Sequence, residues 1–311
     1  MNSNPHILIT GANGFLGRHL VARLIKTNAK VTEVFREISS EVYENRSLIV
    51  IDLNNRKQVK EAFSDLKPNY VIHLADLKNR GNLGSDFYDS YSDNVSISFN
   101  VIDACLRLDG FKKFIFLGSC DEYGAATTPF GEDHREIPIS AYGISKLAVT
   151  KVLSGLYHSR QFPSLVLRPS VIYGPNQGVE MFLPALIQSL LSHKEFLMTE
   201  GDQYRDFIYV DDVVDAIMKA IFADDQLNGS VVNIGYGASI KVKEIAMLVA
   251  NLIDPSACCY LKFGAVQYRL NEVMNYSVDV ACAQKLLGWQ PSTILEHGLL
   301  QTISKFKTQV K

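Results

Sequence analysis

Three polar side chains have the types and the spacing of an acid/base site. Tyr142 and Lys146 are four residues apart in the segment YGISK, so they share one face if that segment is helical. A nearby ammonium group favours the phenolate, which lowers the pKa of the tyrosine towards working pH. Ser119 follows a strand-like run, where its hydroxyl could hydrogen-bond the same substrate oxygen. The Tyr-x-x-x-Lys pattern alone often occurs by chance. The alternative is that Tyr142 and Lys146 have only a structural role.

A glycine-rich turn near the start of the chain has the pattern of an anion-binding loop. It joins an apolar run at 7–9, typical of a buried strand, to a segment with apolar residues at helical spacing. Its first glycine suits the tight turn, its second lets the helix N-terminus approach a pyrophosphate, and its third lets the helix pack on the strand. We interpret it as a dinucleotide-binding loop, and the alternative is a turn without a ligand. The residues assigned to the cofactor here are Gly11, Asn13, Gly14, Phe15, Leu16 and Gly17.

Composition excludes several classes of protein. The 311 residues are 47% hydrophobic and carry a net charge of −2, with no run rich in Lys or Arg, which argues against binding to nucleic acid. No apolar stretch has the length of a membrane span, and the first residues do not form a signal peptide. The five cysteines lack the spacing of metal ligands, so we expect no metal and a reduced, cytoplasmic enzyme.

Strand-like and helical runs alternate from the start of the chain. Strands are expected at 30–35, 48–51, 70–74, 113–118 and 164–168, and helices near 56–66, at 91–108 and at 141–158. This alternation implies right-handed crossovers and a parallel sheet covered on both faces, which binds ligands at the carboxyl ends of its strands. The expected fold class is therefore α/β, with a Rossmann-type doubly wound parallel sheet.

The pattern changes after residue 168, where prolines and glycines indicate irregular loops followed by shorter elements. We predict a dinucleotide-binding domain formed by residues 1–168 and about 205–237. A smaller, discontinuous α/β substrate domain is predicted for about 169–204 and 238–311.

The order of short motifs resembles that of the extended short-chain dehydrogenase/reductases, in their nucleotide-sugar epimerase/dehydratase/reductase group. The matching segments run nearly from end to end of the chain. They are TGANGFLG (10–17), DL (52–53), HLA (73–75), NV (94–95), GSCDEYG (118–124), YGISK (142–146), LRP (167–169), YGP (173–175), RDFIYVDD (205–212) and LLGWQP (286–291).

This resemblance implies a role for each residue of the triad formed by Ser119, Tyr142 and Lys146. Tyr142 would be the acid/base, Lys146 would bind the nicotinamide ribose and lower the pKa of the tyrosine, and Ser119 would polarise the sugar carbonyl. The further cofactor contacts that it implies are Asp52 and Leu53 by the adenine, and Leu74 and Ala75 along the cofactor. The alternatives are that Asp52 only caps the end of a strand and that Ala75 is only a small residue required for packing.

The choice between NAD and NADP depends on the end of the second strand. NAD-binding relatives usually have an acidic residue there, which accepts hydrogen bonds from ribose hydroxyls. In this chain Phe35 stands at that position and Arg36 follows it. Without the carboxylate a 2′-phosphate is not repelled, and a guanidinium can bind it through two hydrogen bonds. We favour NADP as the cofactor, with NAD as the alternative. For Arg36 the alternative is an exposed side chain without a role in cofactor binding.

Two arginines are assigned to the substrate, which the resemblance implies is a nucleotide-diphosphate sugar. Arg205 matches the family's arginine that contacts the diphosphate, and guanidinium groups suit phosphate oxygens. Arg269, followed by Glu272, resembles a later phosphate-binding arginine, although its flanks depart from the usual Arg-Pro-Gly pattern. A surface salt bridge is its alternative interpretation. Asp121 is assigned to the substrate together with Ser119.

Departures from the family pattern bear on the reaction. Val171 stands where many relatives have an asparagine that touches the substrate. The acidic pair that 4,6-dehydratases need after the serine is here Cys120 and Asp121, so the acid position is a thiol unless the loop shifts to bring in Glu122.

An apparent preference for NADP suits a reductase, which consumes NADPH in each turnover, better than a 4-epimerase, which recycles tightly bound NAD. We therefore favour an NADP-dependent reductase of a nucleotide-linked 4-keto-6-deoxyhexose, acting in deoxysugar biosynthesis with Tyr142 as the proton donor to C4. A 4-epimerase comes next and a 4,6-dehydratase third. A non-catalytic NADP-binding regulator would not need to retain the triad. The resemblance also implies a homodimer, in which the helices at 91–108 and 141–158 pair with their copies.

Overall fold

The computed structural model describes residues 4–37, 47–77, 83–269 and 272–309, and these form two compact units. Unit 1 consists of the described residues within Met1–Ala126, His134–Arg168 and Val214–Val232. Unit 2 consists of those within Thr127–Asp133, Pro169–Val213 and Asn233–Lys311. Of the stretch 205–237, which we predicted for the dinucleotide-binding domain, residues 214–232 lie in unit 1 and the others in unit 2.

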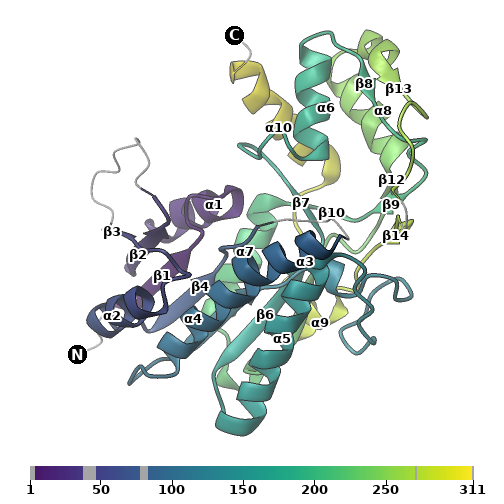
Figure 1. Cartoon of the computed structure of the whole chain (residues 1–311). Helices are drawn as coiled ribbons and strands as arrows, with labels where there is room; N and C mark the ends of the chain where they lie inside the picture. Colours follow the sequence, from purple (N-terminus) through teal and green to yellow (C-terminus); the bar gives the residue numbers. More distant parts are fainter. Residues whose placement is uncertain (1–3, 38–46, 78–82, 270–271, 310–311) are drawn as a thin grey trace. The chain divides into compact units, whose positions relative to one another are not determined.

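Unit 1 is built on a seven-stranded sheet with the order β11-β6-β5-β4-β1-β2-β3 (Figure 1). Its strands are β1 (His6–Thr10), β2 (Lys30–Phe35), β3 (Ser47–Val50), β4 (Tyr70–His73), β5 (Lys113–Leu117), β6 (Ser164–Pro169) and β11 (Val231–Ile234). The pairs from β3 through β2, β1, β4 and β5 to β6 are all parallel. The strand order runs outward from β1 in both directions, as in a doubly wound sheet. The predicted α/β fold class is confirmed.

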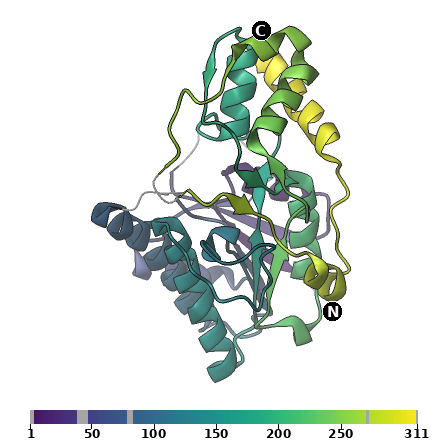
Figure 2. The same cartoon turned by 90° about the vertical axis from the view of Figure 1, so that its right-hand side faces the viewer.

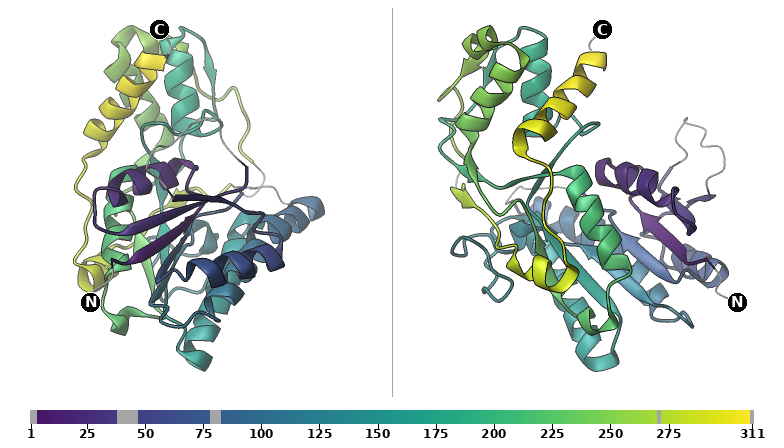
Figure 3. Two further views of the ribbon diagram at one scale, coloured as in Figure 1. Left: turned by 90° about the vertical axis from the view of Figure 1, so that its left-hand side faces the viewer. Right: turned by 180° about the vertical axis from the view of Figure 1, so that it is seen from behind.

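Helices cover both faces of this sheet (Figures 1 and 3). On one face are α2 (Arg56–Leu66), α4 (Ile97–Cys105) and α5 (Ala141–Arg160), and on the other are α1 (Phe15–Leu24) and α7 (Val210–Ile221). An ion pair between Arg23 and Asp215 joins the last two helices.

The apolar core explains why β1 is an interior strand of the sheet. Its residues Ile7, Leu8 and Ile9 are completely buried, since a strand covered on both faces has no side that can be polar. Leu8 packs in a cluster with Phe63 of α2 and Leu153 of α5. Burying each such side chain stabilises the fold by roughly 1.5–3 kcal/mol.

The segment predicted as one helix at 91–108 is more complex. It begins earlier as α3 (Gly84–Ser90), continues as a π-helical turn over Tyr91–Ser96, and ends as α4 at Cys105. Such turns insert an extra residue into a helix and are frequent at functional sites. Here the turn contains the buried side chain of Asn94.

Unit 2 combines small sheets with four helices (Figure 2). β7 (Val171–Tyr173) pairs with β10 (Phe207–Tyr209), β8 (Phe196–Leu197) pairs with β13 (Leu261–Lys262), and β9 (Tyr204–Arg205) lies between β12 (Ile240–Lys241) and β14 (Asn275–Tyr276). The helices are α6 (Phe182–Leu191), α8 (Val242–Ile253), α9 (Ala281–Leu287) and α10 (Leu295–Gln309). α6, α8 and α10 pack side by side around buried residues that include Leu186, Ile245 and Leu299.

Two absences hold for the described part of the chain. None of its helices is both long enough and apolar enough to cross a membrane. It also contains no cluster of three or more His, Cys, Asp or Glu side chains that could hold a metal ion.

Candidate functional site

The carboxyl edge of the sheet in unit 1 gathers most of the predicted site residues. The glycine turn follows β1, Arg36 follows β2, and Ser119 follows β5. Because these strands are parallel, their carboxyl ends lie at the same edge. The acidic residue that follows β4 at this edge, Asp76, was not among the predicted residues.

The glycine turn has the geometry of an anion cradle. Gly11 has a φ of +68°, and a Cβ on it would lie 2.7 Å from the backbone nitrogen of Ala75. A Cβ on Gly17 would lie 2.3 Å from the carbonyl oxygen of Gly11. Gly14 directly precedes α1, and within the described residues no side chain caps this end and no acidic residue is in the first turn. The N–H groups at the start of α1 therefore fit the pyrophosphate of a dinucleotide.

Tyr142 and Lys146 lie on one face of α5, close to its start. The helix begins after Ser140, whose hydroxyl accepts a hydrogen bond of 3.0 Å from the backbone N–H of Gly143. Both side chains are buried, with Tyr142 4% and Lys146 2% exposed. The ammonium group of Lys146 donates to the carbonyl oxygen of Leu117 at 2.7 Å and lies 5.6 Å from the centre of the Tyr142 ring.

Ser119 begins a short 3₁₀ turn, Cys120–Glu122, directly after β5. Its hydroxyl accepts a hydrogen bond of 3.1 Å from the backbone N–H of Asp121, and both side chains are buried. A Cβ on Gly143 would lie 2.4 Å from the carbonyl oxygen of Asp121, so this turn packs directly on the first turn of α5. The structure thus brings the Ser119 turn against the helix that carries Tyr142.

A buried ion pair between Glu122 and Arg168 holds the same turn in place. Glu122 accepts a hydrogen bond of 3.0 Å from the backbone N–H of Ser119, and its other carboxylate oxygen lies 2.7 Å from Nη2 of Arg168. Burial raises the pKa of Glu122, and the charge of Arg168 opposes that shift. Because Glu122 is fully buried in this pair, its side chain does not take the acid position that we considered for a dehydratase.

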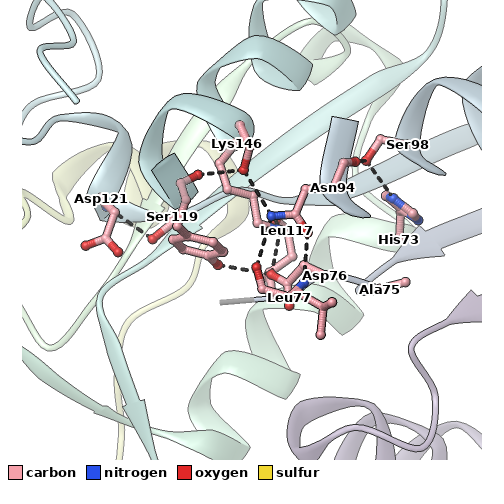
Figure 4. Close-up of polar contacts among 12 residues, drawn as sticks. His73, Ala75, Asp76, Leu77, Asn94, Ser98, Leu117, Ser119, Asp121 and Lys146 are labelled. Carbon is pink, nitrogen blue, oxygen red and sulfur yellow. Dashed lines mark hydrogen bonds and ion pairs between the residues drawn. The ribbon is translucent and has the colours of Figure 1, made fainter. Parts of the chain in front are cut away.

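Asp76 is the functional candidate that sequence reasoning missed. Its Oδ2 accepts a hydrogen bond of 3.0 Å from the hydroxyl of Tyr142 and lies 2.8 Å from Nζ of Lys146 (Figure 4). An acidic residue three positions after the end of a buried strand was the signal that could have found it, because that position lies at the ligand-binding edge of a parallel sheet.

His73, at the end of β4, is a neutral residue near Asp76 and Lys146 that joins neighbouring elements through hydrogen bonds. One ring nitrogen is 2.7 Å from Oγ1 of Thr10 and the other is 2.9 Å from Oγ of Ser98. Its complete burial, followed by the charge of Lys146, lowers its pKa to about 3. The histidine therefore ties β1 and β4 to α4 without carrying a charge.

The remaining residues predicted for the cofactor differ in their surroundings. Phe35 is buried at the end of β2, whereas Arg36 is exposed beyond it. The carboxylate of Asp52 accepts a hydrogen bond of 3.0 Å from the backbone N–H of Asn54, as expected of a turn before a helix. Leu53 and the pair Leu74 and Ala75 are held through their backbone atoms, by Asn100 and Thr10 respectively.

The two arginines predicted for the substrate lie in unit 2, not in unit 1. Arg205, on β9, forms an ion pair with Glu272, and its guanidinium lies 5.2 Å from the centre of the Tyr276 ring. Arg269 is exposed, and its carbonyl oxygen accepts a hydrogen bond of 3.0 Å from the backbone N–H of Glu272. Glu272 thus lies three residues after Arg269 in the chain and forms its ion pair with the distant Arg205.

Comparison with known proteins connects this arrangement to enzymes of nucleotide sugars. The chain is 27% identical to an uncharacterised UDP-glucose epimerase from Bacillus subtilis, with 96% of each chain covered. It is 25% identical to a dTDP-4-dehydro-6-deoxyglucose reductase from Escherichia coli, with 97% of each chain covered. The crystal structure of a UDP-glucuronic acid 4-epimerase from Bacillus cereus, in complex with UDP-glucuronic acid and NAD, has a TM-score of 0.89 and 26% identity, covering 98% of this chain and 99% of that one.

The family profile agrees with these likenesses and with the predicted resemblance. It matches residues 7–235, which include the glycine turn, the Ser119 turn and the helix of Tyr142. The chain belongs to the NAD-dependent epimerase/dehydratase family, within the extended short-chain dehydrogenase/reductases that act on nucleotide sugars.

Proposed function

We propose that this protein is an NADP-dependent reductase of a nucleotide-linked 4-keto-6-deoxyhexose. The observation that carries the proposal of catalysis is the buried pair Tyr142 and Lys146 on one face of α5, with the Ser119 turn packed on the same helix. The observation that favours reduction is the end of β2, where buried Phe35 and exposed Arg36 replace a carboxylate. The similarity to a reductase of a dTDP-linked 4-keto sugar supports this choice.

In the proposed reaction the protein's own residues transfer one proton to the C4 oxygen of the substrate and hold that oxygen in place. Tyr142 donates its phenolic proton to the C4 oxygen of the substrate, and the hydroxyl of Ser119 donates a hydrogen bond to the same oxygen. Lys146 stabilises the phenolate that remains, through its positive charge. A reduced nicotinamide, when bound, supplies the hydride that the C4 carbon accepts, so that ketone, hydride and proton together give the alcohol.

The residues of the cofactor loop fit a dinucleotide. The open start of α1 would hold the pyrophosphate, with Gly11 and Gly17 allowing the tight turn that precedes it. Arg36 would bind the 2′-phosphate of NADP. In unit 2, Arg205 and Arg269 would bind the diphosphate of the nucleotide sugar, and for Arg205 this requires the phosphate to compete with Glu272.

A 4-epimerase with tightly bound NAD is the second candidate. It is favoured by the likeness to a UDP-glucose epimerase and to a 4-epimerase whose structure contains NAD. In that reaction the tyrosine first removes the proton from the C4 hydroxyl and later returns one. The two candidates share the residues of unit 1 and differ in whether the cofactor leaves after each turnover.

One assay separates the two candidates. The purified protein is given a panel of 4-keto nucleotide sugars with NADPH or NADH, and the loss of nicotinamide absorbance is followed. We expect oxidation of NADPH, and a purified protein without bound nicotinamide. Conversion of a 4-hydroxyl nucleotide sugar to its C4 epimer, without net consumption of cofactor, would reject the reductase in favour of the epimerase.

We also infer a homodimer and a reducing, cytoplasmic setting. Large side chains are exposed on the helical segments 84–105 and α5, including Tyr88 (74% exposed), Tyr91 (60%) and Ile144 (42%). Exposed apolar patches of this kind mark interfaces. All five cysteines are free thiols, as expected in a reducing compartment. Light scattering should give twice the mass of the 34.7 kDa chain, and a monomer at micromolar concentration would contradict the dimer.

A further inference from the structure

One carboxylate oxygen is shared by the two groups proposed for proton transfer. Oδ2 of Asp76 lies 3.0 Å from the hydroxyl of Tyr142 and 2.8 Å from Nζ of Lys146 (Figure 4). The Asp76 side chain is 15% exposed and that of Lys146 is 2% exposed, so bulk water screens their interaction weakly. The phenol donates a hydrogen bond to this carboxylate.

The position of Asp76 is fixed on both sides by the surrounding structure. Asn94, in the π-helical turn, accepts from the backbone N–H of Leu77 at 2.8 Å and donates to the carbonyl oxygen of Leu77 at 3.0 Å. The same amide donates to the hydroxyl of Ser145, which lies between Tyr142 and Lys146 on α5. On the other side, the backbone N–H of Ala75 donates to Oγ1 of Thr10 at 3.3 Å. The segment that carries Asp76 is therefore attached to the helix that carries its two partners.

The charges around the phenol come from three elements. Lys146 contributes a positive charge from α5, and Asp76 contributes a negative one from the segment after β4. His73, whose ring interacts electrostatically with both groups, is neutral because burial lowers its pKa to about 3. On the 3₁₀ turn after β5, Glu122 is paired with Arg168. Asp121 lies two residues after Ser119 on the same turn. Asp76 is in direct contact with the phenol.

We propose that Asp76 is a positioning residue that holds Tyr142 against Lys146 and opposes ionisation of the phenol. This inference rests on the proposed acid/base role of Tyr142. The positive charge of Lys146 favours the phenolate, whereas a carboxylate 3.0 Å from the phenol oxygen disfavours it. The phenol then keeps its proton until an acceptor takes it, which suits a proton donor in a reduction. The nearby carboxylate thus keeps the tyrosine protonated, as a proton donor must be before the hydride arrives.

The test is to titrate the phenol with and without the charge of Asp76. Asp76→Asn keeps the size of the side chain and an acceptor oxygen but removes the charge. Ultraviolet absorbance of tyrosinate is measured against pH in the wild type and in Asp76→Asn, each relative to the same protein with Tyr142→Phe. The difference isolates Tyr142 among the 14 tyrosines. We expect its ionisation to move to lower pH by about one unit or more in Asp76→Asn.

Two further variants make the result specific. Asp76→Glu retains the charge, so its titration should stay closer to that of the wild type. Asp103→Asn removes a carboxylate that pairs with Arg56 and Arg107 on the surface, and it should leave the titration of Tyr142 unchanged. Should Asp76→Asn not fold, Asp76→Ser removes the same charge and carries the same expectation.

An unchanged ionisation pH of Tyr142 in the charge-removing variants would overturn the inference and leave Asp76 a structural residue. This readout requires no substrate. A protein that shows the expected shift but turns over no 4-keto nucleotide sugar would instead contradict the proposed function. The pH dependence of kcat should follow the titration, with its alkaline limb at lower pH in Asp76→Asn.

Discussion

Gly143 lies so close to Asp121 that a Cβ on the glycine would be 2.4 Å from the aspartate's carbonyl oxygen. The contact joins the first turn of α5 to the turn that begins at Ser119, and the obstacle is backbone, which cannot rotate away. The distance between the catalytic candidates Ser119 and Tyr142 therefore depends on the absence of a side chain at Gly143.

Gly143→Ala should both destabilise the protein and reduce its activity. An extra methyl group in a packed contact typically costs about 1–3 kcal/mol, which exceeds the gain in helix propensity of about 1 kcal/mol. Gly155→Ala is the matched control on the same helix, because a Cβ there meets open space. Thermal unfolding should show a lower midpoint for Gly143→Ala and an equal or higher one for Gly155→Ala. Equal stability and activity for the two variants would show that the contact is unimportant.

Tyr142→Phe should remove most of the turnover while leaving cofactor binding nearly unchanged. A positioned acid/base group typically contributes on the order of 10²–10⁴-fold to the rate, and the phenyl ring preserves the packing of the side chain. Tyr157→Phe, on the same helix, is the control and should keep wild-type turnover. Initial rates and a cofactor titration on the three proteins provide the measurement. Near wild-type turnover in Tyr142→Phe would end the assignment of this residue as the acid.

His73 should make the protein less stable as the pH falls below about 6.5. The pKa of His73 is about 3 in the folded chain and has its ordinary value of 6.5 in the unfolded chain. Between these values only the unfolded chain binds the proton, so the free energy of unfolding decreases as the pH falls, by up to about 1.4 kcal/mol per pH unit.

Denaturation at several pH values between about 5 and 7 measures this slope. The slope should be shallower in His73→Asn, which cannot bind the proton, and unchanged in His158→Asn, which alters an exposed histidine. Identical slopes in the wild type and in His73→Asn would mean that the buried ring is protonated in the folded protein.

The fold could be predicted because local patterns were enough to define it. The short apolar run at Ile7 to Ile9, with a glycine turn after it, is typical of a strand buried on both faces, and the spacing of apolar residues indicates the helix over Arg56–Leu66. The π-helical turn was not predictable, because the apolar spacing of 91–108 is compatible with one regular helix. That turn places Asn94 where it can hold Leu77, and this is a tertiary contact with no local signal.

The candidate site was predicted where residue type and motif order define it, as for Tyr142, Lys146 and Ser119, and their roles stay predictions. Asp76 was missed because its contact with Tyr142 spans 66 residues of sequence, and its position after a strand was the local signal for it. Similarly, nothing local to Glu122 indicates that it turns inward to Arg168, 46 residues later, and leaves the acid position beside Ser119. Long-range pairs of charged side chains are the part of a site that spacing along the chain does not reveal.

The proposed preference for NADP rests on the end of β2, where Phe35 is buried and Arg36 is exposed. Glu33, two residues earlier on the strand, is 1% exposed and buried in the sheet. A carboxylate is therefore present near this position in sequence, but it lies within the strand and not at its end. Arg36 is therefore the first charged residue beyond the end of the strand, and the exposed Glu37 follows it.

Arg36→Ala should weaken the binding of NADPH much more than that of NADH. Loss of a charge-assisted hydrogen bond of about 1.5–3 kcal/mol corresponds to roughly 10- to 150-fold in affinity, and only NADPH carries the 2′-phosphate that would make it. Phe35→Asp should repel NADPH through its negative charge and favour NADH. Fluorescence titration of both cofactors against the wild type, the two variants and the exposed control Arg160→Ala measures the four pairs of affinities. Equal losses for NADPH and NADH in Arg36→Ala would make this arginine structural, and the reductase would then lose its main support over the NAD-dependent epimerase.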